Sequence, residues 1–214
     1  MIEKIDNTIQ LAGLLLCFAL SLVQLIRKRN MTWELMSLFY GGFLFGELYW
    51  LLYLLLYDET PRFITPDMAW YVSYLFLFLA LQYLSGERFF KFRPVYALIP
   101  VFTVGMCVFF MQWGDYVSNI LAAGFMTALI YRAGRGLDER RKSGVRDHYR
   151  TLCLLTLLYC ALEYALWIIS CFWMGDSLLN PYFWVDLILT VILVAIFFTV
   201  LKLEMQKEEK ESAV

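Results

Sequence analysis

The chain has 214 residues, a net charge of -1, 61% hydrophobic and only 17% charged residues, and a mean hydropathy of +0.63. Soluble domains are nearer half apolar and a quarter charged, so this composition argues against a soluble protein and favours a membrane protein of one domain. The lipid bilayer is therefore the first expected partner, and we expect no nucleic acid among the others.

Seven apolar runs follow one another along the chain, each near the roughly 20 residues that a helix needs to cross hydrocarbon. None alternates with the period of two that barrel strands require, which leaves helices as the spanning structure. The sequence therefore predicts an all-α polytopic membrane protein, with a seven-helix transmembrane domain in residues 1–203 and a short charged cytoplasmic tail in residues 204–214. We place the spans at about 7–26, 33–57, 66–84, 94–112, 116–132, 151–174 and 182–203.

Lysine and arginine gather on one side of these spans. Only Lys4 and Arg62 fall at the N-terminus or in the even-numbered gaps, whereas the other sixteen fall in the odd-numbered gaps or the C-terminal tail. Since basic loops stay in the cytoplasm, this asymmetry predicts a cell-membrane protein with its N-terminus outside and its C-terminus in the cytoplasm. The longest cytoplasmic gap, residues 134–149, is basic, and we interpret it as a solvated connector. The alternative is that it lies against lipid headgroups or docks a partner.

The second and sixth runs, and the third and seventh, share short patterns that suggest an internal repeat. The matching residues lie 114 to 117 positions apart, so the first three helices would correspond to the last three in the same orientation, with the fourth as a linker. The alternative is chance, because tryptophan and tyrosine recur throughout the chain. The pairs are Glu47 and Trp50 with Glu163 and Trp167, and Pro66 and Trp70 with Pro181 and Trp184.

In architecture the chain resembles the seven-helix proteins built as three helices, a linker helix and three helices (3+1+3), which include SWEET-type sugar transporters, PnuC-type vitamin transporters and opsins. The resemblance covers all seven helices but rests on helix count, orientation and the repeat. No Pro-Gln pair marks a PQ-loop repeat, and the seventh helix has no lysine before Lys202 at its cytoplasmic end, so a retinal Schiff base is excluded. The resemblance therefore implies an architecture, and no functional residue is carried over from these families.

Three carboxylates fall inside the predicted hydrocarbon: Glu47, Glu163 and Asp186. Each costs about 2–3 kcal/mol on insertion scales, so an acid in such a place is a candidate for function. Glu47 and Glu163 lie roughly 21 and 18 Å from the cytoplasmic starts of their helices at about 1.5 Å per residue, near the middle of the bilayer. Two interpretations stay open: the acids bind a ligand, or they are neutral and hydrogen-bonded to neighbouring helices as packing contacts.

Aromatic and small polar residues accompany these acids at helical spacing. On the sixth run, a semi-polar stripe leads from Thr156 to Ser170 in steps of three and four residues. An outward-opening cavity with aromatic walls and a few carboxylates suits a small polar or cationic ligand, through ion pairing and cation–π contact. The predicted ligand-binding residues are Glu47, Trp50, Trp70, Tyr74, Tyr159, Glu163, Trp167 and Asp186.

Gly42 and Gly46 form a GxxxG pattern on the second run, which indicates close approach of another helix. Two occupants of that face are open at this point. One is another helix of the same chain, and the other is a second copy or a membrane partner that would form a dimer.

The sequence offers no catalytic or metal-binding pattern. The five cysteines stand singly, His148 is the only histidine, and the HExxH, GxSxG and P-loop patterns are absent. Haem ligation by histidine and histidine-based metal chemistry are therefore not expected. We predict no enzyme activity, no catalytic residue, no metal site and no cofactor.

Taken together, these patterns favour a membrane transporter of a small polar or cationic solute, in which two three-helix units rock around a site near the midplane. Proton or cation coupling through Glu47 and Glu163 is the mechanism to test first. The alternative is a ligand-sensing receptor or accessory subunit, which would bind a molecule in the same cavity and signal to a separate cytoplasmic partner.

The predicted topology can be tested with single-cysteine variants in a background without native cysteines. Cysteines at Thr60 and Ser177 should react with an impermeant thiol reagent added to intact cells, whereas cysteines at Ser143 and Ser212 should react only after permeabilisation. Labelling at Ser143 in intact cells would overturn the assignment.

Overall fold

The computed structural model describes residues 2–59, 61, 64–86, 94–142, 147–173 and 175–212, with residues 64 and 210–212 described by their backbone alone. Within these ranges all regular structure is helical, with seven α helices and one 3-10 turn, which confirms the predicted all-α class. The elements are α1 (Ile2–Lys28), α2 (Met31–Tyr57), α3 (Ile64–Ser85), the 3-10 turn η1 (Pro94–Ala97), α4 (Leu98–Phe110), α5 (Tyr116–Lys142), α6 (His148–Phe172) and α7 (Pro181–Ser212).

Capping residues fix where two of the helices begin. The Asn30 side chain accepts a hydrogen bond from the backbone N–H of Trp33 at 3.1 Å before α2, and Asp147 accepts one from Arg150 at 3.0 Å before α6. Such caps satisfy backbone N–H groups that have no partner within the first helical turn. Arg29 adopts a left-handed conformation with a φ of 48°, and this tight turn sends α2 back along α1.

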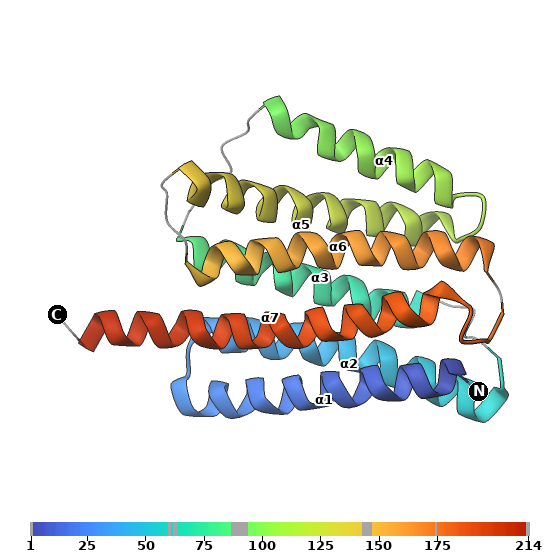
Figure 1. Cartoon of the computed structure of the whole chain (residues 1–214), viewed down its shortest axis with the longest axis horizontal. Coiled ribbons are helices and arrows are strands. Elements are labelled where there is room, and N and C mark those ends of the chain that lie inside the picture. Colours follow the sequence, from blue (N-terminus) through green and yellow to red (C-terminus); the bar gives the residue numbers. More distant parts are fainter. Residues whose placement is uncertain are drawn as a thin grey trace.

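Six helices form a closed ring, with α4 outside it (Figure 1). Around the ring, α1 contacts α2, α2 contacts α3, α3 contacts α5, α5 contacts α6, α6 contacts α7, and α7 contacts α1. The remaining helix, α4, packs against α5 at one edge of the bundle. Because consecutive helices run in opposite directions, α1 and α7 begin at the same end of the bundle at which α2 and α6 stop.

Charges separate along the long axis of this bundle. The end at which α1 begins carries Glu3, Asp58 and Asp176, and we call it the acidic end. The opposite end, towards which α7 continues to Ser212, is the basic end and carries Arg27. The separation follows the uneven distribution of lysine and arginine that the sequence shows.

Aromatic side chains fill the centre of the ring. The rings of Trp33 and Phe197, from α2 and α7, have centroids 5.7 Å apart, and those of Tyr74 and Tyr159, from α3 and α6, are 6.0 Å apart. The hydroxyl of Tyr40 donates a hydrogen bond to a backbone carbonyl of α7 at 2.7 Å. All five side chains are buried, so aromatic packing joins α2, α3, α6 and α7 across the ring.

Five helices, α1, α2, α3, α6 and α7, are long and apolar enough to cross a membrane, which supports the assignment to a membrane. The apolar helix α4 has only 13 residues, or Pro94–Phe110 with the preceding 3-10 turn. The longer α5 falls short of the same mean hydropathy, because polar residues and Arg132 interrupt its apolar run. Seven membrane crossings therefore stay a prediction.

Residues 134–142 do not belong to the connector that the sequence suggested, because α5 continues to Lys142. Residues 143–146 lie outside the described residues, and α6 begins at His148. Arg132 and Arg135 are buried, and Arg132 Nη2 donates a hydrogen bond to Tyr149 Oη at 3.3 Å. For residues 134–142 the interpretation was wrong because the charges were taken as the sign of a loop, although arginine, lysine and glutamate are also strong helix formers.

The glycines of the GxxxG pattern face α3 of the same chain. A Cβ atom added to Gly42 would lie 2.7 Å from Ser73 Oγ and 3.2 Å from Ala69 O. A Cβ atom added to Gly46 would lie 2.6 Å from Trp70 Nε1. The close approach that the pattern predicts therefore occurs between α2 and α3, and α3 covers the face on which a dimer contact was considered.

This packing predicts that Gly46→Ala destabilises the protein, whereas Gly124→Ala does not. The new methyl group at Gly46 meets the Trp70 ring, and such overpacking costs about 1–3 kcal/mol. Nothing lies within 4 Å of a Cβ atom at Gly124, where alanine should be neutral or better than glycine in a helix. Thermal unfolding of both variants in detergent measures the difference. Equal midpoints for Gly46→Ala and Gly124→Ala would contradict the tight α2–α3 contact.

Candidate functional site

A cavity of about 860 Å³ opens at the acidic end of the bundle. All seven helices contribute side chains to its wall, so its shape depends on the whole bundle. Eight carboxylates and ten aromatic side chains line it, and none of the described lining residues is a lysine, arginine or histidine. The carboxylates are Glu3, Asp6, Glu47, Asp67, Asp115, Glu163, Asp176 and Asp186.

Six of the eight predicted ligand-binding residues lie on this wall: Glu47, Trp50, Trp70, Glu163, Trp167 and Asp186. The other two, Tyr74 and Tyr159, are buried beside Glu163 rather than on the wall. They occupy the same stripe of α3 and α6, but the packed aromatic core covers them. A role for any of the eight in binding stays a prediction.

Glu47 and Glu163 lie at the inner part of the cavity. Each carboxyl side chain is only 5% exposed, and the two are close enough to interact electrostatically. Oε1 of Glu163 has no hydrogen-bond partner in the described part of the chain. The buried Nε1 of Trp70 lies beside the Glu47 carboxyl group. A buried polar atom without a partner costs about 1–3 kcal/mol, so Glu163 Oε1 favours an added ligand or water.

A second acidic group lies nearer the mouth, and the sequence analysis identified only one of its two members, Asp186. Asp6 on α1 and Asp186 on α7 interact with one another, and each is 4% exposed. Gln10 Nε2 donates a hydrogen bond to Asp186 Oδ1 at 3.1 Å. The sequence did hold a signal for Asp6, because Asp6 and Gln10 are one helical turn apart and so share a face of α1. Asp6 was missed because it stands just before the predicted first span, residues 7–26.

Hydrogen bonds across the wall hold neighbouring helices together at the mouth. The Ser118 hydroxyl, on α5, donates a short hydrogen bond to the Asp67 carboxylate, on α3. Tyr71 Oη donates to the backbone carbonyl of Ser118 at 2.9 Å. The Asp67 carboxylate is therefore engaged in a contact between α3 and α5, which distinguishes it from Glu163.

At the rim, the first turn of α1 contacts the loops that follow α2 and α6. Lys4 Nζ lies 2.7 Å from Asp58 Oδ1, and this ion pair lowers the pKa of the exposed Asp58 carboxyl. The backbone N–H of Glu3 donates to Asp176 Oδ1 at 3.0 Å. Lys4 thus neutralises an acid outside the cavity and leaves the charge of the wall unchanged.

No group of three or more histidine, cysteine, aspartate or glutamate side chains within residues 2–59, 61, 64–86, 94–142, 147–173 and 175–212 has the arrangement of a metal site. Carboxylates spread over separate helices and interleaved with indole rings fit an organic cation better than a bare ion.

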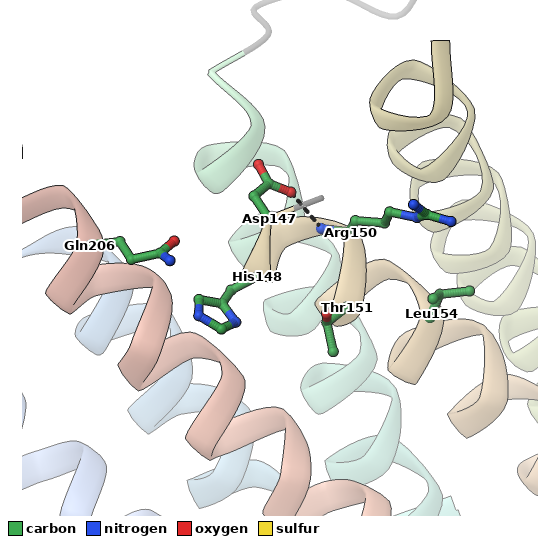
Figure 2. A pocket seen from close by; sticks show the side chains of 6 residues that line it. All are labelled: Asp147, His148, Arg150, Thr151, Leu154 and Gln206. Carbon is green, nitrogen blue, oxygen red and sulfur yellow. Dashed lines mark hydrogen bonds between the residues drawn. The ribbon is translucent and has the colours of Figure 1, made fainter. Parts of the chain in front are cut away.

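A second and smaller hollow, of about 390 Å³, lies at the basic end between α6 and α7 (Figure 2). It is open and lined by a few polar side chains, and Figure 2 shows His148 turned towards Gln206 across it. The Arg150 side chain extends to the other side of α6, away from His148. The hollow offers less enclosure and fewer convergent groups than the acidic cavity, so the acidic cavity is the candidate site.

No family model, no curated protein and no solved structure matches the chain. The proposed function therefore depends on the geometry of the acidic cavity.

The charge of the cavity can be measured through a cysteine on its wall. Cys107 and Cys171 both line the cavity, but only Cys171 is partly exposed, and the other four cysteines are buried. The purified wild-type protein should therefore react first at Cys171. A cationic methanethiosulfonate should react faster than an anionic one, after each rate is divided by that of the same reagent with a small thiol. The preference should weaken with added salt, because salt screens the carboxylates.

The control is a cysteine at Leu179, which is exposed in the loop before α7 and does not line the cavity, placed in a Cys171→Ser background. It should show a smaller preference for the cationic reagent. Equal preferences at the two positions would mean that the electrostatic potential in the cavity is no more negative than that at the exposed loop.

Proposed function

We propose that the protein is a membrane transporter of a small organic cation, which binds in a cavity that opens to the outside of the cell. The observation that carries the proposal is the composition of the cavity wall, which has eight carboxylates, ten aromatic side chains and no basic residue among the described residues. A cation can pair with the carboxylates and lie against the indole faces, where an anion would be repelled.

The ring of helices supports a transport mechanism with two moving halves. Its contacts keep the same pattern when α1, α2 and α3 are exchanged for α5, α6 and α7, and α4 lies outside as a linker would in a 3+1+3 arrangement. Glu47 and Glu163, the acids paired by the repeat, both reach the inner part of the cavity. The halves differ elsewhere, since Trp70 lines the cavity and Trp184 is 52% exposed. Rocking of the halves would then move the site between the two sides of the membrane.

Coupling follows from the placement of the two inner acids on different halves. Glu47 belongs to α2 and Glu163 to α6. Two ionised carboxylates repel, and a cation or proton between them removes the repulsion, so occupancy changes the free energy of bringing the halves together. Binding of the solute, a proton or a second cation at Glu47 and Glu163 would in this way drive the rocking.

One feature of the basic end favours a second candidate, a ligand-sensing receptor or accessory subunit. Two charged helices continue there, α5 to Lys142 and α7 to Ser212, and a cytoplasmic partner could contact their charged ends. A sensor would bind the same cations as a transporter, but it would not carry them across the membrane.

The test uses choline as the probe and its neutral carbon isostere, 3,3-dimethyl-1-butanol, as the ligand control. We expect the purified protein to bind the cation and not the alcohol, and proteoliposomes to accumulate the cation. Glu163→Gln should lower the affinity at least about tenfold, the loss of an interaction of ~1.4 kcal/mol, with little change in thermal stability because glutamine keeps the shape. Glu47→Gln should act in the same direction.

The control variant is Glu59→Gln, which removes an exposed acid at the same end but outside the cavity. Binding without uptake would favour the sensor over the transporter. Wild-type affinity in both Glu47→Gln and Glu163→Gln would return these acids to the packing interpretation, in which Glu163→Leu costs only ~0.6 kcal/mol.

A further inference from the structure

The four buried acids of the cavity lie at two depths. From the acidic end of their helices, Asp6 is four residues into α1 and Asp186 five residues into α7, or about 6–8 Å at 1.5 Å per residue. Glu163 is nine residues and Glu47 ten residues from the ends of α6 and α2, or about 14–15 Å. The outer pair and the inner pair are therefore separated by about 7 Å along the bundle axis.

Tyr182, in the first turn of α7, is a further aromatic side chain close to the four acids. Its hydroxyl is within electrostatic range of all four carboxyl groups, and its ring lines the cavity. The ring therefore offers an apolar contact to a ligand bound among these acids.

The inner pair also has an atom that points to a missing partner. Glu163 is 5% exposed and lines the cavity, and its Oε1 has no hydrogen bond to any described residue. Gln10 orients the outer pair, because its side-chain amide donates to Asp186 Oδ1. Each depth thus presents acceptor atoms, and none of the described lining residues supplies a balancing positive charge.

We propose that the cavity binds a linear aliphatic diamine with both amines protonated, one ammonium group between Asp6 and Asp186 and the other between Glu47 and Glu163. This inference rests on the proposed function, since it narrows the organic cation to a dication of defined length. An extended chain of four or five methylene groups places its nitrogens about 6 to 7.5 Å apart, from bonds near 1.5 Å, which matches the separation of the pairs. A single metal ion cannot bridge them, because its oxygen ligands lie at about 2.0–2.6 Å.

The test measures the affinity of the purified full-length protein for α,ω-diaminoalkanes of three to eight carbons and for the matching n-alkylamines. We expect the affinity to be highest for the four- or five-carbon diamine. That diamine should bind at least about tenfold more tightly than the monoamine of equal length, the factor that a second ion pair of ~1.4 kcal/mol supplies. The expected optimum in length is what separates two fixed anionic sites from a diffuse negative field.

Asp186→Asn tests the outer pair without a large change of shape. The ratio of diamine to monoamine affinity should fall towards one in this variant, and it should be unchanged in the control Glu59→Gln. Binding of monoamines and diamines with equal affinity would overturn this inference and leave cation binding intact. An equal fall in the affinities for monoamines and diamines in Asp186→Asn would have the same consequence. Binding of neither class would overturn the proposed function as well. Tight binding of calcium ions that excludes the diamines would replace the diamine with a metal.

Discussion

Polar groups within an apolar bundle are stable only where they find partners, and this constraint organises the whole structure. The backbone meets it by forming helices, which satisfy their own N–H and C=O groups. Core side chains meet it locally, as Tyr40 does through a backbone carbonyl of α7. Several buried polar atoms of the described chain lack a hydrogen-bond partner, and one of them, Glu163 Oε1, belongs to the wall of the acidic cavity. A bound solute would supply a partner for that atom.

The two ends of the bundle treat buried charge in opposite ways. At the basic end, the carboxylate of Glu204 is buried and accepts hydrogen bonds from Asn30 at 2.6 Å and Thr32 at 3.0 Å, with Lys207 at 2.9 Å. These contacts tie α7 to the start of α2, so the charge serves the structure. At the acidic end, carboxylates from α1, α2, α6 and α7 converge on open space without a described cation. Buried charge is thus paired within the fold at the basic end, whereas the cavity wall at the acidic end has no described cation.

The carboxylates of the cavity come from different helices, and this affects how they can act together. Each of the four deepest acids belongs to a different helix, so any shift of one helix against another changes the distances between them. A ligand that bridges them has a different affinity for each arrangement of the helices, which is what links binding to a conformational change. Close contact between α2 and α3 at Gly42 and Gly46, by contrast, makes that pair of helices a unit. The cavity therefore has carboxylates whose mutual distances change when helices shift, whereas α2 and α3 stay firmly packed against each other.

The sequence by itself determined the all-α class, because apolar runs of helical length with no period of two leave no other structure in a membrane. It also identified Glu47, Glu163 and Asp186 as candidate binding residues, since the free energy cost of placing an acid in a membrane follows from the sequence alone. Only the tertiary structure decided which residues meet, as when Gln10 bonds Asp186 from 176 positions away or Tyr74 and Tyr159 are covered by the aromatic core. The helical period shows which side chains share a face, as it does for Asp6 and Gln10. Which other helix packs against that face depends on how the side chains of all the helices interdigitate when α1 and α7 meet and close the ring. This packing is a property of the whole chain.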